Sequence, residues 1–190
     1  TQIRSAGLTD YQIGAKTFEV IGLPWTPEKV EQLVRRYEEL LPGSLPRIKG
    51  RVLENVREIL EHLRQHRPDV RSYLLTGNTR GGARAKLTYY GLAEFFPDGA
   101  FCEDTNARSS IAHRALTLAR TAGHVDGASV VVIGDTPQDV ECANAIGVRT
   151  LAVATGGYSV DDPAEHAPWR VFKTLPPPEE FLKTLDEVTS

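Results

Sequence analysis

The chain has 190 residues, with 22 basic and 25 acidic side chains and a formal net charge of −3. Its hydrophobic share of 41% and charged share of 25% are typical of globular domains and exclude disordered and fibrous classes. The near-neutral balance disfavours nucleic-acid binding, which needs a concentrated basic face, and the longest apolar run is too short to cross a membrane. The two cysteines lie far apart and match no metal or redox spacing. The sequence therefore predicts a cytoplasmic enzyme or binding domain.

Residues 1–46 form the first predicted unit, which is helical and polar. A stripe of apolar residues from Val30 to Leu41 has helical spacing. It predicts a helix with Thr26 as its N-cap and Pro27 at its first position. Pro42 and Gly43 are expected to end this helix.

The second predicted unit, residues 47–190, alternates helices with strands. Helices are expected over residues 52–63, after a cap at Asn78, and over residues 110–122, 137–146 and 179–185. Strands are expected over residues 70–75, 99–102, 129–133, 149–154 and 169–172. This alternation predicts a doubly wound parallel α/β sheet. Because the run 129–133 lacks polar alternation, it predicts a strand buried on both faces.

The most informative motif is Gly-Asp-Thr-Pro-Gln-Asp at residues 134–139. The strand delivers Asp135 at its carboxyl end, where ligands bind in open parallel sheets, and Asp139 follows in the first helical turn. Two carboxylates at a strand end suit Mg²⁺, which prefers oxygen ligands. A capping box from Thr136 to Asp139 explains Asp139 without any function, but it does not explain Asp135.

A second candidate element is Thr76-Gly77-Asn78, which follows the strand 70–75. Its hydroxyl group and backbone N–H groups, at the start of a helix, form a possible cradle for phosphate. An ordinary turn with Asn78 as N-cap is an equally good interpretation. Of the basic residues on the following helix, Lys86 is the predicted cation for neutralising phosphate charge, with Arg80 and Arg84 as alternatives.

Together these motifs resemble the haloacid dehalogenase (HAD) superfamily, in particular its phosphoglycolate-phosphatase-like members with a helical cap. Residues 74–78 resemble the family's second motif, and residues 130–139, ending in Gly-Asp-x-x-x-Asp, resemble its fourth. Residues 3–13 resemble part of the cap, and residues 47–63 resemble the helix that returns to the core. The resemblance implies a HAD-like core with a partial helical cap over residues 1–46.

The sequence departs from the family pattern in two places. The first motif, an Asp-x-Asp segment on the central strand that supplies the nucleophile, does not occur in residues 1–190. The chain begins at Thr1 and contains no methionine, so we expect a strand carrying this motif to precede it in a longer protein. The family's third-motif lysine is also displaced, because residues 106–110 contain none, and Lys86 is its nearest substitute.

The resemblance implies a Mg²⁺-dependent phosphatase that acts on a small phosphorylated metabolite through an aspartyl-phosphate intermediate. Asp135 and Asp139 would form the metal site, and Thr76, Gly77, Asn78 and Lys86 would bind phosphate. In the cap, Thr9 and Asp10 would contact the leaving group, although a helix cap explains them equally well. No nucleic-acid or membrane partner is expected.

Two alternative functions remain open. A dehalogenase needs no metal, so the carboxylate pair at the fourth motif argues against that activity. A catalytically inactive binding or regulatory domain is supported only by the missing first motif. The residues encoded upstream of Thr1 distinguish the phosphatase from the inactive domain.

Overall fold

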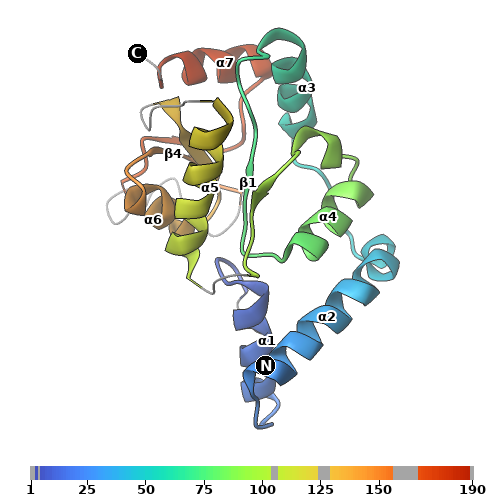
Figure 1. Cartoon of the computed structure of the whole chain (residues 1–190). Coiled ribbons are helices and arrows are strands. Elements are labelled where there is room, and N and C mark those ends of the chain that lie inside the picture. Colours follow the sequence, from blue (N-terminus) through green and yellow to red (C-terminus); the bar gives the residue numbers. More distant parts are fainter. Residues whose placement is uncertain (1–2, 4, 104–106, 124–128, 156–166, 189–190) are drawn as a thin grey trace.

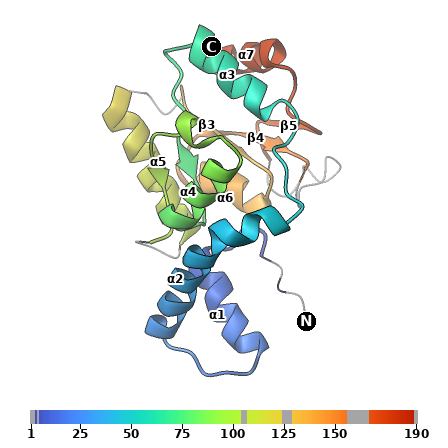
Figure 2. The same ribbon diagram turned by 90° about the vertical axis from the view of Figure 1, so that its right-hand side faces the viewer.

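A computed structural model of the chain describes residue 3 and residues 5–103, 107–123, 129–155 and 167–188. The cap hairpin, defined as α1 and α2, projects from one end of the core, whereas α3 and α7 cover the opposite end (Figures 1 and 2). No helix in the described ranges is both long enough and apolar enough to cross a membrane.

The cap hairpin consists of α1 (Asp10–Val20) and α2 (Pro27–Ser44). Thr26 caps α2 as predicted, and its hydroxyl group accepts a hydrogen bond from the Lys29 N–H. The predicted end of this helix is wrong, because the helix continues through Pro42 to Ser44. A proline in the last turn removes only one backbone hydrogen bond, and a 3₁₀ turn, η1 (Leu45–Arg47), then continues the chain.

The core contains the remaining described helices and the described strands. Its helices are α3 (Val56–His66), α4 (Arg80–Tyr89), α5 (Arg108–Gly123), α6 (Pro137–Ala145) and α7 (Pro178–Asp186), with a 3₁₀ turn, η2, at Ala93–Phe95. Its strands are β1 (Leu74–Leu75), β2 (Gly99–Ala100), β3 (Val131–Gly134), β4 (Arg149–Val153) and β5 (Arg170–Phe172). The predicted alternation of helices and strands is therefore confirmed.

The strands form two parallel sheets rather than one continuous sheet. In the first sheet β1 pairs with β2, with Leu75 opposite Ala100. In the second, β4 lies between β3 and β5, with Ile133 opposite Leu151. Within the described residues, β1 and β3 are not paired with each other. Each of these two strands therefore has one edge that no described strand covers.

Helices cover both faces of the second sheet. Leu151 and Val153 pack with Ile59 of α3 and Phe181 of α7 on one face, whereas Ala152 packs with Val140 of α6. Burying each large apolar side chain of this kind stabilises the fold by about 1.5–3 kcal/mol. This arrangement is the predicted doubly wound α/β architecture.

The two cysteines belong to different cores. Cys102 packs with Ala100 and Ile111 beside the first sheet. Cys142 lies on α6, which packs against β3 and β4 of the second sheet. Both thiols are buried, as expected for a chain without disulfides.

Three local predictions differ from the structure. The run 129–133 was expected to be buried on both faces, yet Ile133 is 45% exposed, because this residue lies on the uncovered edge strand beside a cavity. Helix α3 begins four residues later than predicted, after Asn55, which adopts a left-handed conformation with φ of 64°. Thr79, rather than Asn78, caps α4, and its hydroxyl group accepts the Gly82 N–H.

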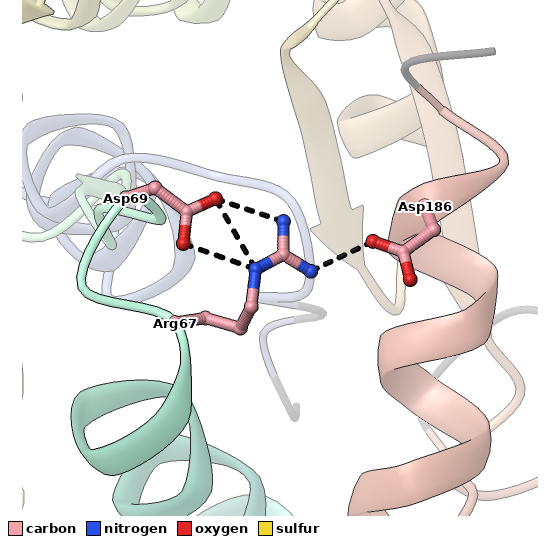
Figure 3. Close-up of polar contacts among 3 residues, drawn as sticks. All are labelled: Arg67, Asp69 and Asp186. Atoms are coloured by element: carbon pink, nitrogen blue, oxygen red, sulfur yellow. Dashed lines mark hydrogen bonds and ion pairs between the residues drawn. The ribbon is translucent and has the colours of Figure 1, made fainter.

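An arginine fastens the C-terminal helix to the end of α3. The Arg67 guanidinium binds both carboxylate oxygens of Asp69 through Nε and Nη2 and, through its third nitrogen, Nη1, binds Asp186 of α7 (Figure 3). The Arg67–Asp186 contact is 2.7 Å long and joins residues 119 positions apart in the sequence. The contact therefore joins α7 to the end of α3.

Candidate functional site

A cavity of about 650 Å³ lies between α2 and α4, but the cavity that contains the predicted motifs is a second one. This second cavity, called the strand-end cavity here, has a volume of about 510 Å³ and opens where β1 and β3 end. It brings together the polar residues that follow both strands with the backbone that precedes α1. Its lining is Ala6, Gly7, Leu75, Thr76, Arg108, Ile133, Gly134, Asp135, Thr136 and Asp139.

The turn after β3 separates the roles of its two carboxylates. Oδ2 of Asp139 accepts the N–H groups of Asp135 and Thr136 and the Thr136 hydroxyl group, at 2.8–3.1 Å. Its other oxygen, Oδ1, is bound by an arginine. Because both oxygens of Asp139 are occupied, Asp135 is the carboxylate of this motif that can face a ligand.

Arg108, at the start of α5, is the cation of the strand-end cavity. Its Nη2 atom lies 2.5 Å from Asp139 Oδ1, and both side chains are largely buried. Its buried Nε–H has no hydrogen-bond partner among the described residues. A buried donor without a partner is costly, so this group favours an anionic ligand.

Sequence reasoning missed Arg108, although a local signal was available. The helix dipole disfavours a basic residue at a helix N-terminus. An arginine at the first position of α5 is therefore unfavourable for the helix itself and calls for another explanation. The ion pair with Asp139 supplies that explanation.

The electrostatics of the cavity act most strongly on Asp135. The cavity walls remove part of its hydration, and the adjacent Asp139 adds a like charge, so the pKa of Asp135 is raised above its ordinary value of 3.8. Arg108 acts in the opposite direction. The ionised form of Asp135 therefore costs the folded state free energy that a bound cation would offset.

The loop after β1, residues 76–79, contains an internal hydrogen bond that stabilises its turn. The Thr76 hydroxyl oxygen accepts the Asn78 N–H at 3.1 Å, which leaves the hydroxyl proton of Thr76 free to donate into the cavity. Gly77 is buried, and a Cβ atom there would lie 2.7 Å from the carbonyl oxygen of Leu8. Among the predicted phosphate-binding residues, Thr76 alone lines the strand-end cavity.

The remaining predicted residues lie behind that loop. Lys86 donates to the Asn78 side-chain oxygen at 3.1 Å and does not line the strand-end cavity. Thr9 is fully buried and forms a capping box with Gln12 at the start of α1. The Asp10 carboxylate accepts hydrogen bonds from the loop itself. These residues surround the loop instead of facing the cavity.

The described residues fit a magnesium ion only in part. Asp135 offers an accessible carboxylate with a raised pKa, which suits an oxygen ligand of Mg²⁺. Both oxygens of Asp139 already accept hydrogen bonds, and the described residues contain no group of three or more His, Cys, Asp or Glu that could hold a metal. A magnesium ion here would need further ligands from water, phosphate or another segment.

The fold and the strand-end cavity define a Rossmann-like α/β protein with a charged site at the carboxyl ends of its strands. Residues 109–177 match the HAD-hydrolase-like family model. No curated protein matches the chain in sequence.

Solved structures extend the likeness to almost the whole chain. A hydrolase from Pseudomonas syringae is 19% identical, with a TM-score of 0.71, and the match covers 98% of this chain and 82% of that protein. A HAD hydrolase, family IA, variant 3, from Entamoeba histolytica is 14% identical, with the same TM-score and coverage of 98% and 81%. A predicted phosphoglycolate phosphatase from Haemophilus somnus is 19% identical, with a TM-score of 0.64 and coverage of 88% and 71%.

These likenesses, all below 25% identity, establish the fold. The family match adds a likeness in sequence, and it covers the segment that contains Asp135 and Asp139. The chain therefore has the fold of these HAD-like hydrolases, and its residues 109–177 match the HAD-hydrolase-like family model. The predicted fold class is confirmed, and the predicted resemblance to the HAD superfamily is supported by the family match over residues 109–177.

Proposed function

We propose that this chain is the larger part of a cytoplasmic, Mg²⁺-dependent phosphatase that hydrolyses a small phosphorylated metabolite. The observation that carries the proposal is the strand-end cavity, where the Thr76 hydroxyl group, the Arg108 guanidinium and the Asp135 carboxylate meet. A hydroxyl donor and a guanidinium suit phosphate oxygens, whereas the carboxylate suits a cation bound to the same phosphate. The likeness to a phosphoglycolate phosphatase supports a small substrate.

Each residue has a distinct task in this proposal. Thr76 donates to a phosphate oxygen, and Arg108 neutralises negative charge as the phosphorus–oxygen bond breaks. Asp139 holds Arg108 and the turn after β3 in place. Asp135 would hold the magnesium ion, which when bound polarises the phosphate and offsets its charge.

The nucleophile would come from a further strand between β1 and β3, outside residues 1–190. Two observations support this strand: the uncovered edges of β1 and β3, and the 45% exposure of Ile133 on the second edge. Buried sheets rarely leave backbone N–H and C=O groups unpaired. A parallel strand in this place would end at the strand-end cavity, where a carboxylate at its tip could attack the phosphorus atom.

Hydrolysis of p-nitrophenyl phosphate by the natural full-length protein, measured against magnesium concentration and with EDTA, tests this function. We expect turnover that saturates with Mg²⁺, disappears with EDTA and is lost in Asp135→Asn. Turnover by Asp135→Asn above about a tenth of wild type would contradict the metal role. A folded full-length protein without any turnover would instead favour a binding domain.

A further inference from the structure

The contacts between the cap hairpin and loop 76–79 converge on one side chain. Asp10, at the first position of α1, is only 7% exposed. One of its carboxylate oxygens accepts the Thr79 N–H at 2.8 Å, and the other accepts the Asn78 amide group at 3.0 Å. The Asp10 N–H donates in turn to the carbonyl oxygen of Gly77 at 2.8 Å. One cap residue thus binds three consecutive residues of the loop.

The core is shaped to receive this contact. A side chain at Gly77 would approach Leu8 O to 2.7 Å and Thr9 Cα to 3.1 Å, so the chain before α1 can lie on the loop only because residue 77 is glycine. The Thr79 hydroxyl group also bonds to Glu38 of α2, which gives the loop a second attachment to the hairpin. The loop is therefore held from the cap side by α1 and α2.

These contacts decide which loop groups face the cavity. Asp10 occupies the Thr79 N–H, and Thr76 Oγ1 occupies the Asn78 N–H. The Thr76 hydroxyl proton is left to donate into the cavity. Without Asp10, the buried Thr79 N–H would lose its acceptor, and the loop would have to rearrange to satisfy it.

We propose that Asp10 is a positioning residue that couples the cap hairpin to the phosphate site: docking of α1 fixes loop 76–79 in the conformation that aims Thr76 into the strand-end cavity. This inference rests on the proposed function for the identity of the ligand. Asp10 itself touches neither phosphate nor metal. Displacing the hairpin would weaken phosphate binding, although no cap residue in this network contacts the phosphate.

The test uses the natural protein and perturbs the contact from both sides, with Asp10→Ala in the cap and Gly77→Ala in the loop. Asp10→Asn keeps one acceptor oxygen and serves as the partial rescue. Glu39→Ala is the matched control, because Glu39 is an exposed acidic residue of the same hairpin that pairs with Arg36 on its own helix. Amide hydrogen exchange at Thr79 and inhibition by inorganic phosphate are the two readouts.

We expect amide exchange at Thr79 to be at least tenfold faster in both alanine variants, relative to exchange of the amides of α6. Inhibition by inorganic phosphate should weaken, and KM for p-nitrophenyl phosphate should rise, by about tenfold each, which corresponds to about 1.4 kcal/mol. Asp10→Asn should lie between the alanine variants and wild type, and Glu39→Ala should match wild type. Unchanged exchange at Thr79 would overturn the anchoring role, and faster exchange with unchanged phosphate inhibition and KM would overturn the coupling. If wild type neither binds inorganic phosphate nor hydrolyses p-nitrophenyl phosphate, the proposed function fails and the coupling with it. The exchange rate at Thr79 still tests the anchoring role separately.

Discussion

Asp135 and Asp69 respond to folding in opposite ways. Burial and the neighbouring Asp139 raise the pKa of Asp135, whereas hydrogen bonds from Arg67 lower the pKa of Asp69. A raised carboxyl pKa means that the folded state binds the proton more tightly, so this group costs stability as the pH rises from 3.8 through the folded value. A lowered pKa gives stability that is present above 3.8 and lost as the pH falls through the folded value.

The first prediction is that Asp135→Asn raises the thermal unfolding midpoint at pH 7 while abolishing any response of that midpoint to Mg²⁺. The neutral amide keeps the shape of the carboxyl group and removes a charge that the cavity disfavours. The gain should shrink as the pH is lowered toward 3, where the wild-type carboxyl group is protonated. Differential scanning calorimetry at several pH values measures both effects, and a lower midpoint at pH 7 would contradict the electrostatic argument.

The second prediction separates two basic residues. Arg108→Ala should lower kcat on p-nitrophenyl phosphate by about 10²- to 10³-fold, because it removes a charge placed where negative charge develops. Lys86→Ala should act mainly on KM, because Lys86 reaches the site only through Asn78. Arg108→Lys, which keeps the charge but not the fork geometry, is the control. Equal effects of the two alanine variants on kcat would contradict this assignment.

Among the elements, α3 and α7 are joined by the Arg67 contacts (Figure 3). We predict that Arg67→Met lowers the unfolding midpoint by at most about 2–4 °C at pH 7, because both carboxylates are largely exposed, and by less near pH 3. The methionine preserves the apolar stem, so the difference reports the loss of the ion pairs. Asp69→Asn should shift the midpoint in the same direction by a smaller amount, because Asp186 still binds the arginine. A difference in midpoint between wild type and Arg67→Met that is the same at pH 7 and pH 3 would show that packing, not charge, joins the two helices.

Helices were predicted better than strands, and the physical reason differs by element. Thr26 and Pro27 are strong local signals, so the start of α2 was correct. Helix α3 begins four residues later than predicted, because the left-handed conformation of Asn55 before it depends on tertiary contacts, including the hydrogen bond from its side-chain amide to the carbonyl oxygen of Leu175. Strand β1 is only two residues long, although a longer apolar run predicted it, since strand length depends on pairing that the run itself does not contain.

The candidate site was predictable only where one segment carries all the information. Asp135 and Asp139 lie within five residues, and the capping box was visible in the sequence. The Arg108–Asp139 pair joins residues 31 positions apart, and the Asp10–Thr79 bond joins residues 69 apart. Such contacts exist only after the sheets and the hairpin have assembled, so residue spacing could not reveal them.

At the scale of the whole molecule, the uncovered edges of β1 and β3 have a consequence for the chain in isolation. Residues 1–190 expressed alone should bind a hydrophobic dye such as ANS and aggregate, because exposed strand edges pair with other chains. Light scattering and dye fluorescence compare this fragment with the natural protein. A monomeric fragment that unfolds cooperatively and binds no dye would contradict the proposed intervening strand.

The two cysteines lie in different cores, so the reactivity of each thiol measures the local opening of its own part of the molecule. Burial, as the largest cause, raises the pKa of Cys102 to about 11 and also raises that of Cys142, so neither thiol should react with alkylating reagents in the native state at pH 7. Each becomes reactive only when its own core opens. The strands beside Cys102, β1 and β2, are two residues long each and are shorter than β3 and β4 beside Cys142. We therefore predict faster alkylation of Cys102 than of Cys142 in the natural protein, measured by mass spectrometry with the Cys102→Ser and Cys142→Ser variants as controls. Equal alkylation rates would mean that both halves unfold together. In either case the two native thiols measure the opening rate of each half without any added label.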